Sequence, residues 1–400
     1  MEIITEKAYL RADGRKGIRN ITLVVALVEC ARHVAEQIVR PYEEQGDVHL
    51  MVWSGCYPND YSQKIISNIA KHPNTGAVLF VSLGCEGMNR TALAEMANNS
   101  GRWTETLVIQ ENGGTSSTIA KGRALIEQAK EVKKSFERVN MGMDELIVGT
   151  ICGGSDATSG ITANPAVGGA FDLMISRGAR CIFEETGELI GCEERIRPRA
   201  INEEVGDALV KSIQKASYYY ELMGHGSFAP GNADGGLTTV EEKSLGSYCK
   251  SGDSPISGVI APGDIPEATG LYLMDVVPEG EPRFGFPNIN DSSEIMELIA
   301  SGSHIILFTT GRGSVVGSIV SPVIKVCANP KTYENLSEDM DINAGSILTG
   351  EKTLLQVSEE IVLKVEGLMK GEQSLSEALG HRESVLLYKG EMAQKTLCGM

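Results

Sequence analysis

The sequence predicts an α/β fold of two Rossmann-like lobes, each with a mainly parallel sheet and glycine-rich loops at the strand ends. Short apolar runs alternate with longer segments of helical pattern, which is typical of βαβ units. The pattern then starts again after about residue 144. A chain of 400 residues exceeds the usual size of one domain. We therefore expect an N-terminal α/β domain over 1–143 and a C-terminal α/β domain over 144–400.

The first lobe contains a run of predicted strands with helices between them. The buried apolar runs that predict strands cover 22–28, 49–53, 77–83 and 105–110. Helices are predicted over 31–39 and 117–139. Two of the strands lead into glycine-rich turns, Gly84-Cys85-Glu86-Gly87 and Gly113-Gly114-Thr115.

The second lobe repeats this order and carries more of the polar loops. Its predicted strands cover 146–151, 180–185, 256–260 and 304–308. Helices are predicted over 165–177 and 202–222, and the charged segment 350–385 is also expected to be helical. The stretch 224–256 is predicted to be mostly loop on either side of the segment 239–248.

The loop 152–165 is the most informative segment. It follows a predicted buried strand and holds a thiol, a carboxylate, an amide and four hydroxyls within fourteen residues. Open α/β sheets bind ligands at the carboxyl ends of their strands, so this loop is the first candidate for a site. The alternative is a plain turn followed by a capped helix. The candidates that the loop supplies are Cys152, Gly153, Gly154, Ser155, Asp156 and Asn164.

Four glycine-rich loops are expected to bind an anionic substrate. They are 84–87, 113–115, 152–165 and 309–314. Backbone amides in such loops bind anions, and Arg312 in the last of them offers a bidentate partner for a carboxylate. None of these loops contains the Gly-x-Gly-x-x-Gly or Walker A pattern, so no dinucleotide or nucleoside triphosphate site is predicted. The expected substrate-binding residues are Arg312, Gly113, Gly114, Thr115, Gly153, Gly154, Asn164 and Thr239.

The segment 230–246 supplies the candidate base. Thr239 and Glu242 have the spacing of a helix capping box, so Glu242 either caps a helix or faces the pocket. Lys243, with a lowered pKa, would remove a proton from the carbon beside a carboxylate. Ser155 and Asp156 complete the set of predicted catalytic residues.

A divalent metal ion would be held by carboxylates and thiolates from distant segments, because no closely spaced histidine pair exists. The expected ligands are Cys85, Glu86, Cys152 and Glu185. Glu184, Glu185 and Glu188 end the strand near residue 183, and the alternative for them is a solvated helix start. Cys30 and Cys56 are interpreted as packing thiols.

The composition excludes several classes of protein. A net charge of −17 argues against non-specific binding to nucleic acid or to anionic membranes. No apolar run is long enough to span a bilayer, and the first residues do not resemble a signal peptide. Nine cysteines without a Cys-x-x-Cys pair favour reduced thiols in a cytoplasmic protein. The lack of Gly-x-Ser-x-Gly disfavours acyl-transfer hydrolysis.

Several of these segments together resemble a known family. They are 11–20, 72–74, 83–86, 109–115, 152–165, 230–246, 308–313, 322–325, 339–345 and 378–383. In this order they are similar to the large, C-terminal part of the altronate dehydratase/galactarate dehydratase family, over nearly the whole chain. The large subunit of sulfolactate sulfo-lyase is a relative in the same group.

The resemblance implies a lyase that acts on a sugar acid or hydroxy acid. A proton leaves the carbon beside the carboxylate and a β-substituent departs, with a divalent metal, first Fe²⁺ and otherwise Mn²⁺ or Mg²⁺, stabilising the enediolate. Sugar-acid members carry a further small N-terminal domain, whereas this chain opens directly at Arg11–Asn20. We therefore expect a small partner subunit, and also a homo-oligomer.

Three other functions remain open at the level of the sequence. A sulfo-lyase would release sulfite instead of water. A non-catalytic sugar-acid-binding protein would bind without turnover, and an NAD(P) oxidoreductase would rest on the α/β architecture alone. Where the sugar-acid branch has a His-x-x-Gly-Cys segment, this chain has Trp53-Ser54-Gly55-Cys56.

Overall fold

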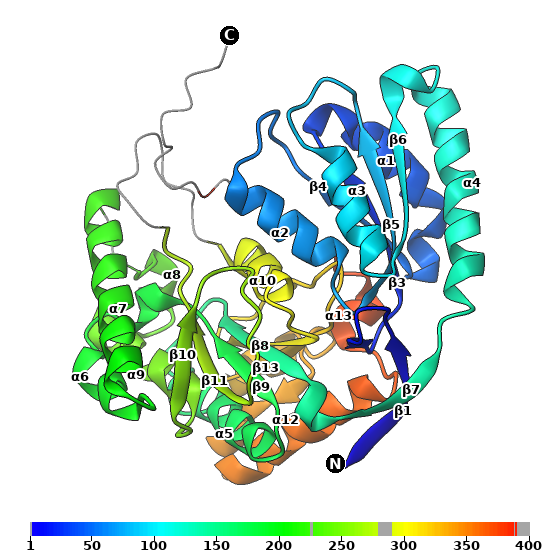
Figure 1. Cartoon of the computed structure of the whole chain (residues 1–400). Coiled ribbons are helices and arrows are strands. Elements are labelled where there is room, and N and C mark those ends of the chain that lie inside the picture. Colours follow the sequence, from blue (N-terminus) through cyan, green and yellow to red (C-terminus); the bar gives the residue numbers. More distant parts are fainter. Residues whose placement is uncertain (1, 225–226, 279–289, 388, 390–400) are drawn as a thin grey trace.

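The computed structural model describes residues 2–224, 227–278, 290–387 and 389 and confirms the predicted α/β fold (Figure 1). A four-stranded parallel sheet of order β4-β3-β5-β6 lies in the first lobe. A seven-stranded parallel sheet of order β10-β11-β9-β8-β12-β13-β14 lies in the second. None of the helices in the described ranges is long and apolar enough to cross a membrane.

The first sheet is covered by helices on both faces, as its strands require. Its elements are β3 (Ile21–Ala26), α1 (Arg32–Val39), β4 (Val48–Val52), α2 (Asp60–Ala70), β5 (Thr75–Ser82), α3 (Arg90–Asn99), β6 (Trp103–Val108) and α4 (Thr115–Lys133). Every residue of β3 and β5 is buried. Such continuous apolar runs are typical of parallel strands covered on both sides.

The predicted helix over 117–139 is wrong at its carboxyl end. Helix α4 ends at Lys133, and Arg138–Gly142 forms β7, which pairs antiparallel with β1 (Ile3–Leu10). A short β2 (Lys16–Gly17) completes this three-stranded sheet. The partner of β7 lies at the far end of the lobe's sequence, and local periodicity carries no sign of such a distant pairing.

The second lobe carries the larger sheet and most of the helices. Its strands are β8 (Ile147–Cys152), β9 (Arg180–Phe183), β10 (Ile256–Ile260), β11 (Gly270–Met274), β12 (Ile305–Thr310), β13 (Val323–Cys327) and β14 (Ile342–Asn343). Its helices are α5 (Ala163–Ser176), α6 (Glu193–Ile196), α7 (Glu203–Met223), α8 (Pro230–Asp234), α9 (Val240–Tyr248), α10 (Asp291–Ala300), α11 (Pro330–Asn335), α12 (Leu354–Met369) and α13 (Leu375–Leu379).

Strand β8 is central in the second sheet. The chain places β9 on one side of it and β12 on the other. The chain continues from β8 to β9 on one side and later returns to β12 on the other, so the strand order reverses at β8. Open α/β sheets bind ligands at the carboxyl ends of the strands where this reversal occurs. The polar loop that begins at Cys152 lies at this point.

Buried hydrogen bonds of the segment 11–20 hold the lobes together. The side chain of Arg11 donates to the carbonyl oxygens of Pro73 at 2.7 Å and Arg19 at 3.0 Å. Asn74 is fully buried, and its Oδ1 accepts from the amides of Ile18 at 2.9 Å and Arg19 at 3.2 Å. Its Nδ2 donates to the carbonyl of His304 in the second lobe at 3.2 Å. This segment therefore has a structural role.

Apolar contacts between the lobes are continuous. Leu23 and Phe80 of the first lobe share one core cluster with Ile147 and Phe308 of the second. The boundary near residue 143 stays a prediction, because the shared core joins the lobes across it. The last residues of the expected second domain, 390–400, lie outside the described part of the chain.

Replacement of Asn74 tests this connection. Asn74→Ala removes the acceptor of two amides and the donor to the second lobe, and we expect a loss of about 2–4 kcal/mol in the free energy of unfolding. Urea unfolding measures it. Asn99→Ala, at an exposed position at the end of α3, is the matched control and should change stability by less than about 0.5 kcal/mol. Equal stability of the two variants would contradict the structural role.

Candidate functional site

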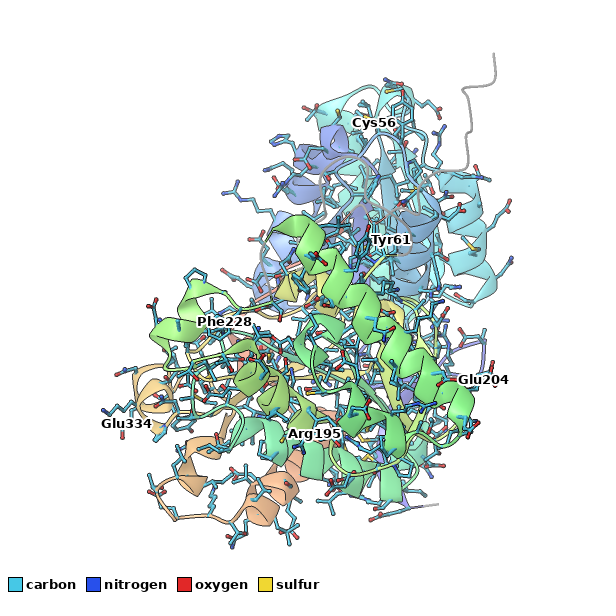
Figure 2. The ribbon with its side chains drawn as sticks, turned by 90° about the vertical axis from the view of Figure 1, so that its left-hand side faces the viewer. Cys56, Tyr61, Arg195, Glu204, Phe228 and Glu334 are labelled. Atoms are coloured by element: carbon cyan, nitrogen blue, oxygen red, sulfur yellow. The ribbon has the colours of Figure 1, made fainter. Side chains whose placement is uncertain are left out.

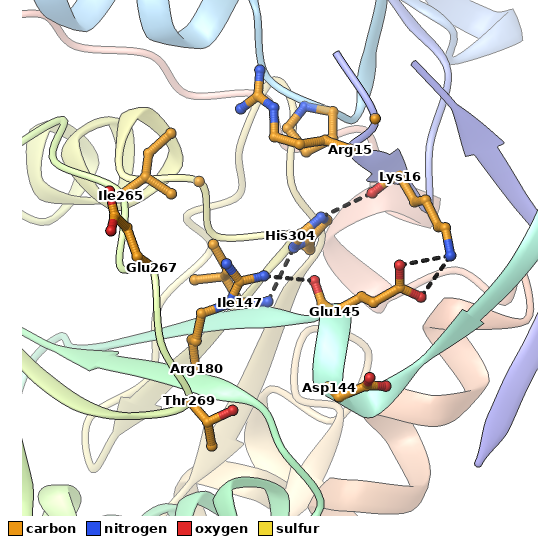
Figure 3. A pocket seen from close by; sticks show the side chains of 13 residues that line it. Arg15, Lys16, Asp144, Glu145, Ile147, Arg180, Ile265, Glu267, Thr269 and His304 are labelled. Carbon is orange, nitrogen blue, oxygen red and sulfur yellow. Dashed lines mark hydrogen bonds and ion pairs between the residues drawn. The ribbon is translucent and has the colours of Figure 1, made fainter. Parts of the chain in front are cut away.

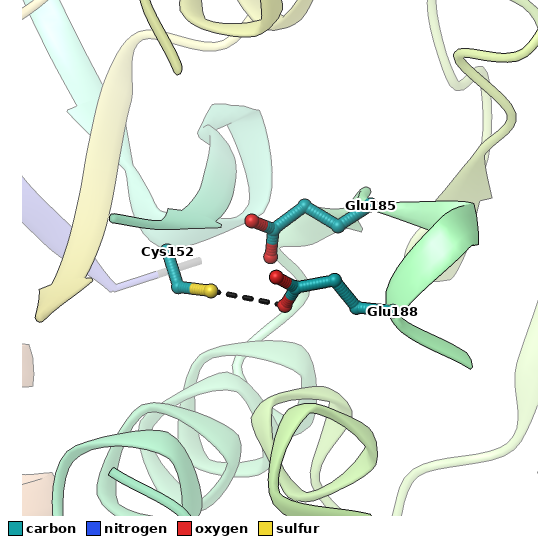
Figure 4. A group of neighbouring side chains, drawn as sticks. All are labelled: Cys152, Glu185 and Glu188. Atoms are coloured by element: carbon teal, nitrogen blue, oxygen red, sulfur yellow. Dashed lines mark hydrogen bonds between the residues drawn. The ribbon is translucent and has the colours of Figure 1, made fainter. Parts of the chain in front are cut away.

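A cluster of buried ionisable side chains lies at the carboxyl ends of β8 and β9. Cys152 ends β8, while Glu185 and Glu188 follow β9, and Figure 4 shows these three side chains pointing toward one another. Lys243 reaches the cluster from α9, and Lys250 reaches it from the short 3-10 helix Cys249–Ser251. The cluster therefore draws on three segments that are distant in the sequence: the end of β8, the turn after β9, and α9 with the 3-10 helix that follows it.

Glu188 is the centre of this cluster. Its carboxylate accepts from Cys152 Sγ at 3.0 Å and Ser247 Oγ at 2.7 Å, and it pairs with Lys243 Nζ at 2.6 Å. Lys250 Nζ lies 3.7 Å away. Burial alone would raise the pKa of Glu188, but the two lysines outweigh it and hold this pKa well below its usual range. Glu188 is therefore ionised at neutral pH.

Glu185 combines a strained backbone with a shifted pKa. Its φ of 76° makes it the one non-glycine residue with a left-handed backbone in the described ranges. Such a conformation costs about 1–3 kcal/mol and is concentrated at functional sites. Burial and the neighbouring charge of Glu188 raise the pKa of Glu185 to about 7, against the opposing ion pair with Lys250. Glu185 can thus gain or lose a proton near neutrality.

Two further carboxyl groups are buried beside Glu185. Both oxygens of Glu184 and one oxygen of Glu294 have no hydrogen-bond partner. Burial first, and then neighbouring carboxylates, raise the pKa values of Glu184 and Glu294 well above their usual range. In the described part of the chain, no ion pair joins either of them to a cation. These groups must be either protonated or neutralised by a bound cation.

The arrangement suits a divalent cation. Two groups of side chains have ligand atoms within 4.8 Å of one another, and they share Glu185: Cys152, Glu185 and Glu188, and Glu184, Glu185 and Glu294. Carboxylate oxygens suit hard divalent ions, and a thiolate adds affinity for first-row transition metals. The unpartnered oxygens of Glu184 fit the same interpretation. The donor set does not select among Fe²⁺, Mn²⁺ and Mg²⁺.

A cavity of about 260 Å³ opens onto this cluster. It is lined by Gly153, Gly154, Lys243 and Asp291, and by the glutamates Glu185, Glu188 and Glu294. Burial and the charge of Glu188 raise the pKa of Asp291 to about 6. A second cavity of about 260 Å³ lies on the other side of Lys243. A small hydroxy acid in either cavity would contact the amine of Lys243.

The predicted catalytic residues have different surroundings. Lys243 lies in the cluster, but the expectation of a lowered pKa is wrong: burial lowers it, and the ion pair with Glu188 outweighs burial and raises it. Ser155 Oγ lies 3.5 Å from Cys152 Sγ. Asp156 is buried and accepts from the amide of Thr158 at 2.9 Å and from Asn329 Nδ2 at 2.8 Å, so it stabilises the loop.

The capping alternative for residues 239–242 is confirmed. Thr239 is the N-cap of α9, and its hydroxyl accepts from the amide of Glu242 at 3.1 Å. The carboxylate of Glu242 accepts from the amide and hydroxyl of Thr238 at 2.8 and 2.7 Å and is exposed to solvent. These two residues therefore start the helix that carries Lys243 into the cluster.

The predicted substrate-binding residues fall into two places. Gly153 and Gly154 line the cavity, and the carbonyl of Gly154 accepts from the amide of Arg312 at 2.9 Å. The side chain of Arg312 donates to the carbonyl of Gly231 at 3.1 Å. Asn164 borders the second cavity, and its buried Oδ1 has no partner. Gly113, Gly114 and Thr115 lie in the first lobe, at the start of α4.

The predicted metal ligands are likewise divided. Cys152 and Glu185 meet in the cluster, whereas Cys85 and Glu86 follow β5 in the first lobe and belong to neither candidate group. Glu86 accepts from the hydroxyl of Ser82 and from the amide of Gly84. The alternative of a solvated helix start for 184–188 is wrong, because Glu184 is only 3% exposed.

Sequence reasoning missed Lys250, Asp291 and Glu294. Helix α10 begins at Asp291, and its N-cap Asn290 accepts from the amide of Ser293 at 3.0 Å. That capping pattern was the available signal for the helix. The carboxyl groups of Asp291 and Glu294 join the site only because the fold brings α10 to the ends of β8 and β9, which are distant in the sequence. Lys250 lies in a polar loop that gave no signal of burial.

Another cavity, of about 270 Å³, lies at the amino-terminal ends of β8 and β9, between the lobes (Figure 3). Its charged side chains bind one another or the backbone. Lys16 pairs with Glu145 at 2.6 Å, Arg180 donates to the carbonyl of Glu145 at 3.1 Å, and His304 accepts from the amide of Ile147 at 3.1 Å. Of these contacts, the ion pair between Lys16 and Glu145 connects the lobes.

Comparison with known proteins identifies similar sequences over most of the chain. The family model described as D-galactarate/altronate dehydratase, C-terminal, matches residues 143–392. The model described as D-galactarate dehydratase/altronate hydrolase, second domain, matches residues 8–133.

Named relatives are identical to this chain at about 30% of the aligned positions. The altronate dehydratase of Bacillus subtilis is 32% identical over 375 residues, which cover 90% of this chain and 72% of that protein. The galactarate dehydratase (L-threo-forming) of Escherichia coli is 32% identical over 382 residues, 89% of this chain and 71% of that protein. The (2R)-sulfolactate sulfo-lyase subunit beta of Chromohalobacter salexigens is 30% identical over 402 residues, 94% and 96% of the two chains.

The buried carboxyl groups predict a stability that falls as pH rises. Glu184, Glu185 and Glu294 have raised pKa values, so their stabilising contribution is present at low pH and is lost as pH rises through about 7 for Glu185. Thermal unfolding with EDTA should give a lower Tm at pH 8 than at pH 5.5. Glu184→Gln should raise stability at pH 8 by about 1–3 kcal/mol.

The control for this experiment is Glu204→Gln, at an exposed position on α7 (Figure 2). It should keep the pH dependence of the unaltered protein. Mn²⁺ added at pH 8 should raise the Tm of the unaltered protein, because a cation neutralises the ionised carboxylates. A Tm that is independent of both pH and Mn²⁺ would contradict the charge imbalance.

Proposed function

The chain belongs to the D-galactarate/altronate dehydratase family, and from this premise we propose that it removes water from a sugar acid of the altronate or galactarate type. The relatives named as dehydratases are hydro-lyases. One observation carries the proposal for this chain: the buried cluster of carboxylates and lysines at the ends of β8 and β9 faces a cavity. Such a cluster is suited to proton transfer beside a carboxylate.

The metal would be held by Cys152, Glu185 and Glu188, with Glu184 and Glu294 next to them. A bound divalent ion, with Fe²⁺ as the first candidate, would supply Lewis-acid stabilisation of the enediolate and of the departing oxygen. It would also offset the charge of the carboxylates that have no cationic partner. Cys85 and Glu86, which lie in the other lobe, are not part of this proposed site.

Lys243 is the proposed base that takes the proton from the carbon beside the substrate carboxylate. Its amine borders both cavities and is held by Glu188 at 2.6 Å. Before it can accept a proton it must lose its own, and its ion pair with Glu188 raises its pKa.

The loops around the cavity would bind the substrate. Gly154, after β8, and Arg312, after β12, are joined by a backbone hydrogen bond, and we propose that the loops carrying them bind the substrate carboxylate. Asn164, whose buried Oδ1 has no partner, would accept from a substrate hydroxyl. Gly113, Gly114 and Thr115 lie in the other lobe and bind no substrate in this proposal.

A sulfo-lyase is the second candidate, and one observation favours it. The match to the sulfolactate sulfo-lyase covers 96% of that subunit, against 71–77% of the dehydratases. That relative is named subunit beta, which supports a partner subunit for this chain as well. The homo-oligomer stays a prediction. A purely sugar-acid-binding role stays an alternative to catalysis.

Turnover of a substrate panel separates these functions. Altronate, galactarate and sulfolactate are incubated anaerobically with the chain and Fe²⁺, with and without a candidate small subunit. Formation of a keto acid from a sugar acid supports the dehydratase. Sulfite from sulfolactate would reject water as the leaving group, and tight binding of a sugar acid without any product would reject catalysis.

Substitution of Lys243 tests its role. Lys243→Met should lower kcat by about 100-fold or more, because the proton acceptor is lost. The same loss is expected for Glu188→Gln, which removes the carboxylate that pairs with Lys243. Lys331→Ala, at an exposed position on α11, is the matched control and should keep full activity. An active Lys243→Met enzyme would assign the base to another residue.

A further inference from the structure

Three cysteines follow neighbouring strands of the first sheet, in the lobe opposite the site described above. Cys30 follows β3, Cys56 follows β4 and Cys85 follows β5. In the sheet, Ala26 of β3 pairs with Val52 of β4 and with Val81 of β5.

Each cysteine lies four residues after the paired residue of its own strand, which is Ala26, Val52 or Val81. Parallel strands run in the same direction, so equal offsets bring the three cysteines to one edge of the sheet.

All three cysteines are exposed, so the interpretation of Cys30 and Cys56 as packing thiols is wrong. Figure 2 shows Cys56 near the end of the first lobe, far from Arg195 and Glu204 of the second. Contacts between the loops fix their arrangement. The amide of Gly87 donates to the carbonyl of Cys56 at 2.8 Å, which joins the loop after β5 to the loop after β4.

Glu86 determines which way the loop after β5 faces. Its buried carboxylate accepts from the amide of Gly84 at 2.9 Å and from the hydroxyl of Ser82. The neighbouring Cys85 is exposed. The loop is therefore built with its carboxylate inside and its thiol outside.

Glycines shape the loops at this edge. Gly84 has a φ of 130°, and Gly113 and Gly114, after β6, have φ values of 75° and 83°, which residues with a side chain rarely adopt. The amide of Gly84 donates to Glu86 and that of Gly114 to the carbonyl of Ile109, so both belong to the loops themselves. The amide of Gln110 donates to the carbonyl of Leu83 at 3.2 Å, which ties the loop after β6 to the loop after β5.

The spacing of the strands favours a group larger than a single ion. Neighbouring strands are about 4.8 Å apart, so β4 and β5, on either side of β3, are about 10 Å apart. Two thiolates on one zinc ion lie about 4 Å apart, since each Zn–S bond is about 2.3 Å. None of the three cysteines belongs to a described group whose ligand atoms lie within 4.8 Å. Thiolates select zinc, copper(I) or iron–sulfur clusters, and of these a cluster is the group that joins thiolates lying farther apart than the ligands of one ion.

We propose that Cys30, Cys56 and Cys85 bind a four-iron, four-sulfide cluster through three thiolates, each thiol losing its proton. Three thiolates leave one iron of such a cluster without a cysteine from this edge. That iron, on an exposed face, would take an oxygen ligand such as water, a hydroxyl group or a carboxylate. This site is separate from the proposed dehydratase site at the ends of β8 and β9.

Anaerobic reconstitution of the full chain with iron and sulfide tests the proposal. We expect about four iron and four sulfide per chain and the broad visible absorption of iron–sulfur charge transfer. Cys30→Ser, Cys56→Ser and Cys85→Ser should each lose most of the iron, sulfide and absorption. Cys249→Ser, a partly exposed thiol of the second lobe, is the control and should retain them.

A second measurement guards against loss of folding in the variants. In the unaltered protein, the cluster should protect Cys30, Cys56 and Cys85, but not Cys249, from alkylation as followed by mass spectrometry. Glu188→Gln should keep the cluster even if it loses turnover, so the two proposals fail independently. Three results would overturn the inference: iron bound without sulfide, a disulfide between two of Cys30, Cys56 and Cys85, or a cluster content in the Cys→Ser variants equal to that of the unaltered protein.

Discussion

The structure around the carboxyl end of β8 follows from a charge imbalance. Glu184, Glu185, Glu188 and Glu294 are buried together; Lys243 pairs with Glu188, and Lys250 pairs with both Glu185 and Glu188. Burying an ionised carboxylate without a partner costs several kcal/mol. The lysines neutralise Glu185 and Glu188, whereas Glu184 and Glu294 must be neutralised by a proton or by a bound cation. A site with spare negative charge is one that a metal ion can complete.

The lobes contribute to this site in unequal ways. The second lobe supplies every member of the cluster, and the first supports it from behind. Helix α2 packs on α10, and Tyr61 of α2 donates to Glu297, which also pairs with Lys389 at 2.6 Å. Helix α10, which carries Glu294, is thereby held between the two sheets. At the other end of the sheets, the buried hydrogen bond from Asn74 to the carbonyl of His304 connects the lobes.

Each sheet presents its chemistry at the carboxyl ends of its strands. The second sheet gathers carboxylates and amines, which suit hard cations and proton transfer. The first carries exposed thiols after three neighbouring strands, and thiolates suit soft metals. The same geometric rule thus places two different sets of ligands, because the strand ends of a parallel sheet are the points where distant segments meet.

The sequence by itself determined the four strands of the first sheet, β8, β9, β10 and β12 of the second, the long helices α4, α5, α7 and α12, and the polar loop after β8, because buried parallel strands are continuous apolar runs that local pattern reveals. It also singled out Cys152, Glu185 and Lys243. The tertiary structure alone decided that Lys250 and Glu294 join them, that Asp156 is engaged within its loop, and that β7 is a strand. Pairing, burial and pKa depend on residues brought together by the crossovers of the fold, and no local pattern encodes which distant side chains will meet.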